Sequence, residues 1–217
     1  MKKILLLFLS LVTAGNLCSQ SLWDASPADT PFTFGVRAGM NLAHTDADCA
    51  TSVHTGFHFG VSVDYNIIKS FSLSSGLYYV GKGFRGNQNL AAATEQTESS
   101  VTAAYVQVPL LASWRIEAPS GIRFNVNVGP YFAYGLGGSA KYKPLDLTLT
   151  NYFDGDTFGD NGLLKKFDAG LSLGLMVQMS HVLIGASYEL GLTDVGHQAR
   201  FSKFHNRNVC LTLGYNL

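Results

Sequence analysis

Charged residues are scarce in this 217-residue chain, at 14%, against the ~25% typical of soluble domains. The formal net charge is zero, so the composition offers no basic surface for nucleic acid. After residue 12 there is no apolar run of the ~18 residues that a membrane-spanning helix needs. Glycine (23 residues) and aromatic side chains (12%) are plentiful instead. This combination leaves a soluble β-sandwich or a transmembrane β-barrel as the main fold classes.

Catalytic motifs are also missing. The chain contains no G-x-S-x-G, no H-E-x-x-H and no phosphate-binding glycine loop. Ser202 and His205 are close in sequence, but no third residue that would orient the histidine can be named. The sequence therefore predicts that the protein is not an enzyme.

Cysteine is rare, and the three cysteines form no framework. Cys49 and Cys210 are far apart in the sequence, and a single disulfide between them is left as an alternative. Cys18 raises the alternative of a lipoprotein, but Leu17 precedes it where such a signal requires a small residue.

The first residues have the pattern of a secretory signal peptide. Lys2 and Lys3 precede an apolar run at residues 4–12, which is too short for a spanning helix. Cleavage is expected after Ser19. The predicted organisation is thus a signal peptide at residues 1–19 and one domain at residues 20–217.

Apolar and polar side chains then alternate with period two, as in strands whose successive side chains point to opposite faces. Phe57, Phe59 and Val61 share one face, for example, while His58 and Gly60 share the other. Eight such runs are found, at residues 32–43, 56–66, 71–82, 102–116, 122–132, 166–178, 181–191 and 208–217. Their lengths of about 9–15 residues suit a tilted membrane crossing, which needs about 9–11, better than the ~5–6 residues of soluble strands.

The second face of these runs is rich in glycine, serine and asparagine, which suits the crowded interior of a small closed barrel. Closure also removes the unpaired strand edges that lipid does not tolerate. The predicted fold is all-β: a closed antiparallel up-and-down transmembrane β-barrel of about eight strands. Phe59, Leu173 and Leu213 should then face outward, while Asp64, Arg123 and Glu189 face inward. Tyrosines and a tryptophan near strand ends are expected in interfacial girdles: Tyr78, Tyr79, Trp114, Tyr131, Tyr134 and Tyr215.

Eight charged residues fall on the inward face. Buried charges are costly unless paired, so the prediction is a polar network that fills the lumen, with a solute or ion path as the alternative. The predicted network consists of Arg37, Asp64, Lys82, Arg115, Arg123, Lys166, Asp168 and Glu189.

Connections alternate between short and long. Short ones are expected at residues 67–70, at 118–121 and at Ser180, and long ones at 44–55, 83–101, 137–164 and 193–205. Residues 90–100 are interpreted as a flexible loop. Outer-membrane barrels have short periplasmic turns and longer outer loops, so both termini are expected to be periplasmic.

Two loops contain candidate metal ligands. The first has His44, Asp46, Asp48, Cys49, His54 and His58, in a spacing that matches no closed structural site. The second, at residues 151–161, has three aspartates but lacks the register and closing glutamate of a calcium loop. No metal and no cofactor is predicted.

Several stretches resemble the small outer-membrane β-barrels, porin-like or PorT-like, that are common in Bacteroidetes. The matching stretches are FGVRAGMNL (34–42), YVQVPLL (105–111), NVGPYFAYGL (127–136), KFDAGLSL (166–173), IGASYELGL (184–192) and NRNVCLTLG (206–214). The resemblance implies a barrel of eight to ten strands, exported and inserted by the outer-membrane assembly machinery of a Gram-negative cell. Many such barrels end in an aromatic residue, whereas this chain has Tyr215 two residues before a terminal Leu217.

The sequence therefore predicts an integral outer-membrane barrel with a structural or binding role through long outer loops. A narrow passive pore for small solutes is the main alternative, and a soluble lipocalin-like ligand binder is a weaker one. Outer-membrane lipid and the assembly machinery are the expected partners, nucleic acid is not, and no other partner is indicated.

Overall fold

The fold was obtained as a computed structural model that describes residues 23–45, 51–52, 54–89, 96–144, 153–158, 164–196 and 205–217. The predicted signal peptide, residues 1–19, lies outside these residues. Within them the structure has ten strands: β1 (Phe32–Thr45), β2 (Thr51–Ser52), β3 (His54–Ile68), β4 (Phe71–Asn89), β5 (Gln96–Glu117), β6 (Ile122–Pro144), β7 (Phe153–Asp156), β8 (Phe167–Met179), β9 (Val182–Gly191) and β10 (Asn206–Asn216). No helix among the described residues has the length and hydropathy to cross a membrane.

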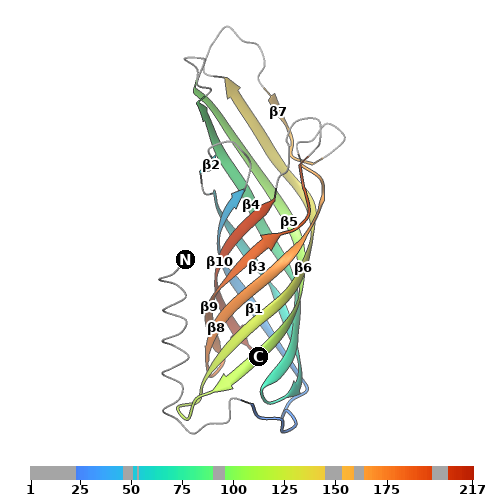
Figure 1. The fold of residues 1–217 in the computed structure, drawn as a ribbon, viewed down its shortest axis with the longest axis vertical. Coiled ribbons are helices and arrows are strands. Elements are labelled where there is room, and N and C mark those ends of the chain that lie inside the picture. Colours follow the sequence, from blue (N-terminus) through green and yellow to red (C-terminus); the bar gives the residue numbers. More distant parts are fainter. Residues whose placement is uncertain are drawn as a thin grey trace.

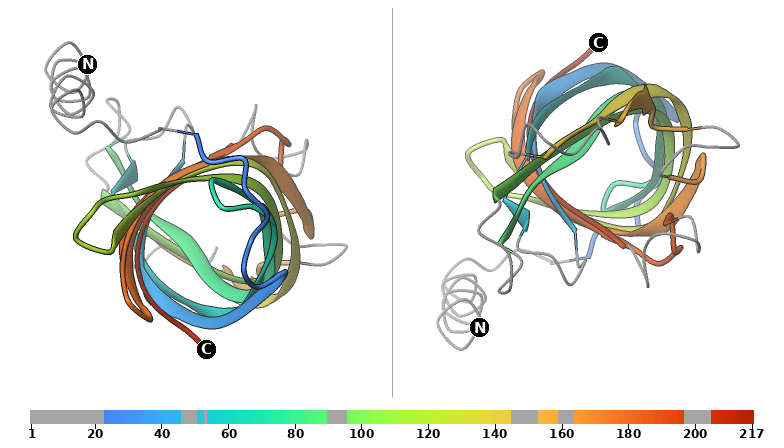
Figure 2. Two further views of the ribbon diagram at one scale, coloured as in Figure 1. Left: turned by 90° about the horizontal axis from the view of Figure 1, so that it is seen from below. Right: turned by 90° about the horizontal axis from the view of Figure 1, so that it is seen from above.

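Eight of these strands form a closed antiparallel ring. Their order is β4–β3–β1–β10–β9–β8–β6–β5, and the pairing of β4 with β5 closes the circle. The end-on views of Figure 2 show this ring directly. The short strands β2 and β7 only extend the edges of β4 and β6. The prediction of a closed barrel of about eight strands is confirmed.

The outward face of the barrel is apolar. Phe59, Leu173 and Leu213 expose 58%, 51% and 58% of their surface, whereas Glu189 exposes 6% and Asp64 is half-buried. Arg123 differs from the prediction: 42% of its side chain is exposed, at the rim beside Glu117. Such a surface is favourable against hydrocarbon, while the polar inner residues are shielded from it. A soluble lipocalin-like binder keeps its apolar face inside, so the observed orientation excludes that alternative.

The two ends of the barrel differ. One end, here called the turn end, has the short connections Lys69–Ser70, Ala118–Gly121 and Ser180–His181, as predicted. Gly121 adopts a φ of 77°, a left-handed conformation that favours glycine in a tight turn. Leu217 also lies at this end, and the segment that starts at Trp23 lies over part of the opening (Figure 2, blue in the view from below).

At the opposite end, here called the loop end, the structure differs from part of the prediction. Residues 83–101 and 137–164 were expected to be long connections, and residues 90–100 a flexible loop; of these, 90–95, 145–152 and 159–163 lie outside the described residues. Instead β4 and β5 stay paired from Gly83–Thr102 to Asn89–Gln96, and β6 continues to Pro144. Figure 1 shows β4, β5 and β6 running past the ends of β9 and β10. A backbone ladder does not require alternating hydrophobicity, so the periodic pattern ended before the strands did.

The expected aromatic girdle is correct for only part of the set. Tyr79, Tyr134 and Tyr215 expose 39%, 54% and 46% of their surface on the outer face, and Trp114 is also exposed. Tyr131, however, is fully buried in the lumen, and Tyr78 lines a lumen cavity. Both lie on the inward phase of their strands, and because β4 continues to Asn89 and β6 to Pro144, neither is near a strand end.

Candidate functional site: the bridged lumen

Lys82 connects opposite walls of the barrel. It lies on β4, and its Nζ is 3.5 Å from Asp168 Oδ2 on β8 and 3.5 Å from Glu189 Oε2 on β9. In the ring of eight strands, β9 is four strands from β4 in either direction. The Lys82 side chain must therefore cross the lumen to reach Glu189. We call these three residues the lumen bridge.

Both carboxylates of the lumen bridge are fully engaged. Asp168 accepts hydrogen bonds from Asn206 Nδ2 at 2.9 Å and from Thr193 Oγ1 at 3.0 Å. Glu189 accepts hydrogen bonds from Gln107 Nε2 at 2.5 Å and from Asn208 Nδ2 at 3.1 Å. Because donors from the surrounding strands satisfy the carboxylate oxygens, the ions can stay buried despite the cost of leaving water.

Two tyrosines complete the surroundings of the ammonium group. Lys82 Nζ lies 4.6 Å from the ring centroid of Tyr131 and 5.5 Å from that of Tyr105, both within cation–π range. All of these groups are excluded from solvent: Lys82 exposes 2% of its surface, Asp168 0% and Tyr105 1%. The lumen is closed at this level by packed side chains.

An apolar cap lies on the tyrosines toward the loop end. Phe158 packs edge-on against Tyr105 with 5.3 Å between ring centroids, and it is buried together with Leu164 and Val195. Thr157 Oγ1 donates to Thr102 O at 2.8 Å and anchors the segment to β5. A Cβ at Gly135 would approach the Phe158 ring to 2.5 Å, so glycine is needed there for Phe158 to fit. The loops before β8 and β10 thus contribute a second closure.

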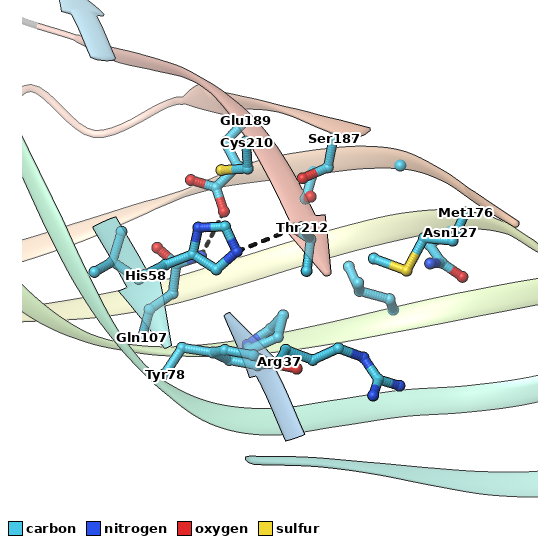
Figure 3. A pocket seen from close by; sticks show the side chains of 15 residues that line it. Arg37, His58, Tyr78, Gln107, Asn127, Met176, Ser187, Glu189, Cys210 and Thr212 are labelled. Atoms are coloured by element: carbon cyan, nitrogen blue, oxygen red, sulfur yellow. Dashed lines mark hydrogen bonds between the residues drawn. The ribbon is translucent and has the colours of Figure 1, made fainter. Parts of the chain in front are cut away.

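A cavity of about 90 Å³ remains on the turn-end side of the lumen bridge (Figure 3). His58 projects into it, with Nε2 3.0 Å from Thr212 Oγ1 and Nδ1 2.5 Å from Asn41 Oδ1. Arg37 also lines the cavity, and its Nη2 donates to Asn216 Oδ1 at 2.7 Å. The space is large enough for a few water molecules and too small for a wide aqueous channel.

The predicted polar network is divided in the structure. Lys82, Asp168 and Glu189 come together in the lumen bridge, while Arg37 lies separately near the turn end. The remaining four do not reach the bridge: Asp64 is half-buried on β3, Arg115 donates to Ile68 O, Arg123 pairs with Glu117 at the rim, and Lys166 is exposed just before β8.

Sequence reasoning missed the uncharged members of the site. Gln107 and Asn208 fall on the inward phase of the runs 102–116 and 208–217, but nothing in their spacing indicates which carboxylate they contact. Phe158 and Val195 fall in segments without periodicity. The one available signal was an isolated large apolar residue in an otherwise polar loop, which often marks a packed position.

The candidate metal ligands do not gather. Among the described residues, no group of three or more histidine, cysteine or acidic side chains could hold a metal ion. His58 belongs to the lumen hydrogen-bond network, and Cys210 is a free, buried thiol. Asp46, Asp48 and Cys49 lie outside the described residues, as do Ser202 and residues 151–152 and 159–161 of the acidic stretch.

The sequence itself also matches a known family. Residues 19–196 match the family described as "Outer membrane protein beta-barrel domain". The chain belongs to this family. The outer-membrane barrel assignment therefore rests on the sequence match and, independently, on the closed ring with its apolar exterior. A comparison with curated proteins finds no significant match.

Several solved structures match most of the chain at low sequence identity. Ail of Yersinia pestis, in complex with the heparin analogue sucrose octasulfate, is 13% identical over 87% of this chain and 100% of its own, with a TM-score of 0.46. OprG of Pseudomonas aeruginosa is 11% identical over 91% and 99%, with a TM-score of 0.46. Neisserial surface protein A is 12% identical over 85% and 97%, with a TM-score of 0.42. These values carry no conclusion about the function of the present barrel.

Proposed function

We propose that this outer-membrane barrel is a non-conducting protein with a structural or binding role at its loop end. The lumen bridge is the observation that supports closure. A lysine that spans the barrel between two hydrogen-bonded carboxylates leaves no continuous water path at that level. The apolar cap of Phe158, Leu164 and Val195 supports closure a second time, nearer the loop end.

The length of β4, β5 and β6 supports a role outside the membrane. β5 has 22 residues, which at ~3.3 Å per residue extend about 70 Å along the strand. Even at a tilt of ~45°, this is about 50 Å along the barrel axis, against ~30 Å of hydrocarbon. The excess forms the sheet that projects at the loop end (Figure 1), and such a sheet offers a surface to the cell exterior.

The turn end is assigned to the periplasm in this proposal, because outer-membrane barrels carry their short turns on that side. Residues 1–19 are proposed as a signal peptide and 20–217 as the mature barrel domain, inserted by the outer-membrane assembly machinery. Kinship with the PorT-like barrels of Bacteroidetes is proposed from the stretches quoted above. No catalytic role is proposed, because no nucleophile, base and oriented third residue have been identified together.

A narrow passive pore is the second candidate. The cavity of about 90 Å³ lined by Arg37, His58 and Glu189 favours it, because part of the lumen is not filled by side chains. For conduction, both the lumen bridge and the apolar cap would have to move aside together.

Single-channel recording in planar lipid bilayers decides between the two candidates. The refolded wild-type barrel is expected to insert without unitary conductance steps. The double variant Lys82→Ala, Phe158→Ala removes one residue from each closure and should show small, brief openings, which establishes that the assay detects a passage of this width. Stable unitary steps in the wild-type protein would overturn the closed-lumen proposal and favour the pore.

A further inference from the structure

The turn end contains a second, larger polar recess that is separate from the lumen bridge. Its volume is about 400 Å³, which is several times the ~30 Å³ that one water molecule occupies in the liquid. We call it the turn-end recess. The side chains that matter for its chemistry are Trp23, Asp24, Lys69, Arg115, Glu117 and Arg123.

The segment at residues 23–31 builds one wall of the turn-end recess. Its backbone is tied to the β3–β4 turn: Ser70 N donates to Asp24 O at 3.2 Å, and Lys69 N donates to Ser26 O at 3.0 Å. The Trp23 ring lies 6.5 Å from the ring of Phe71, measured between centroids. These contacts hold the wall in place beside the ends of β5 and β6.

The recess has an excess of positive charge. Three cations, Lys69, Arg115 and Arg123, line it against two acids, Asp24 and Glu117, which leaves a formal charge of +1. Both acids are already engaged. Asp24 Oδ1 accepts a hydrogen bond from Ser26 N at 2.9 Å, and Glu117 Oε2 lies 3.2 Å from Arg123 Nε.

Arg115 is the cation left with binding capacity. Lys69 pairs with Asp29 at 3.7 Å, but no carboxylate of the described residues lies within ion-pair distance of Arg115. Its Nη2 donates to Ile68 O at 3.0 Å, which fixes the guanidinium against the turn. Its Nε is buried and has no acceptor among the described residues. Because Nε has almost no accessible surface, the other guanidinium N–H groups are the donors that a ligand in the recess can reach.

We propose that the turn-end recess binds a small anion through carboxylate or phosphate oxygens, with Arg115 as the main contact and Arg123 as the second. The planar guanidinium presents donors in the geometry that these oxygens accept. Besides the buried Nε and the Nη2 hydrogen bond to Ile68 O, the remaining guanidinium N–H groups of Arg115 supply the specific contact. Two sources share this chemistry: a free anion in the surrounding solution, and the phosphate of a lipid headgroup. The proposal does not depend on whether the lumen conducts.

The test uses the full-length barrel in phospholipid-free detergent micelles. Inorganic phosphate, citrate and glycerophosphoglycerol are titrated separately by calorimetry, with sodium chloride at matched ionic strength as the blank. Trp23 gives a local readout: of the two tryptophans in the chain, Trp114 is replaced by Phe, so that fluorescence reports only from the recess wall. Saturable binding of phosphate or citrate indicates a free anion as the ligand, and binding of glycerophosphoglycerol alone indicates a lipid headgroup.

Arg115→Gln should weaken binding roughly 10- to 100-fold, the range for loss of a charge-assisted hydrogen bond. Arg115→Lys keeps the charge but lacks the planar guanidinium with its several donors, and should lose roughly tenfold in affinity. Lys166→Gln removes a positive charge just before β8, outside the recess, and should bind like wild type. Heat-modifiable migration in gels verifies that each variant is folded. If neither calorimetry nor Trp23 fluorescence responds above the chloride blank, or if Arg115→Gln binds as tightly as wild type, the proposal is wrong.

Discussion

At the scale of single residues, Lys82 forms the ion pairs that connect opposite walls of the barrel interior. It is separated from Asp168 by 86 positions in the chain and exposes 2% of its surface. It also provides the positive charge that two buried carboxylates share. Removing one partner of a buried ion pair is costly because the remaining charge has no compensation.

Replacing Lys82 by Met keeps an unbranched side chain and removes this compensation. The free energy of unfolding should fall by about 3–5 kcal/mol, measured by urea titration of the barrel in micelles. Lys166→Met changes an exposed lysine and should stay within about 0.5 kcal/mol of wild type. The double variant Lys82→Met, Glu189→Gln should recover part of the loss, since one uncompensated carboxylate is gone. A Lys82→Met barrel as stable as wild type would contradict this role.

Gly39 shows how closely the inner face is packed. A Cβ there would lie 1.9 Å from the Leu211 carbonyl oxygen and 2.5 Å from His58 Cε1. The carbonyl belongs to the β1–β10 ladder and cannot move away freely. At Gly137, by contrast, a Cβ would meet nothing within 4 Å.

Gly39→Ala should therefore destabilise the barrel by about 1–3 kcal/mol through overpacking, whereas Gly137→Ala should be close to neutral. Parallel urea unfolding of the two alanine variants provides the comparison. Equal effects at the two sites would show that the inner wall adjusts more easily than its packing implies.

Alternation decides which way a residue points, and for this reason the inward phase of Lys82, Asp168 and Glu189 could be predicted from the sequence. It does not decide the level at which a side chain meets its partner. That level depends on the stagger between strands on opposite sides of a closed sheet, which only the full set of registers defines. The lumen bridge itself was thus beyond sequence reasoning, as was the separation of Arg115 and Arg123 toward the rim.

At the scale of elements, the sequence requirements of the barrel wall differ from those of the strands that project beyond it. Strand segments in the wall need one apolar face for lipid, and this requirement produces the period-two pattern. The outer parts of β4 and β5 are held together by their ladder from Gly83–Thr102 to Asn89–Gln96. They lie where no lipid imposes a pattern, and this explains why their strands were mistaken for a loop.

Because the projecting hairpin pairs mainly with itself and with β6, the wall should close without it. Replacing residues 86–99 by an Asn-Gly turn joins Arg85 to Ser100, which are direct partners in the ladder, and Asn-Gly suits a two-residue hairpin. The shortened barrel should refold and keep the gel shift between heated and unheated samples. Loss of that shift would mean that the projection is part of the folding unit.

At the scale of the whole molecule, the fold is inverted relative to a soluble barrel. Large apolar side chains cover the outside, while asparagine, glutamine, serine and ion pairs fill the inside. In the closed ring each strand of the wall is paired on both sides, so no strand edge is left with unpaired backbone groups, as a lipid environment requires. Composition and periodicity predicted this arrangement because a transmembrane wall constrains every second residue along eight strands.

Quenching of tryptophan fluorescence by brominated phospholipid tests this central claim most directly. In a background with Trp23 and Trp114 replaced by Phe, one tryptophan is introduced at Phe59, which exposes 58% of its surface, or at Tyr105, which exposes 1%. Phe59 pairs with Tyr79 and Tyr105 with Val80, so the two sites lie close together on the wall, two strands apart. Strong quenching at position 59 with little at position 105 is the predicted result, and the reverse order would contradict the account.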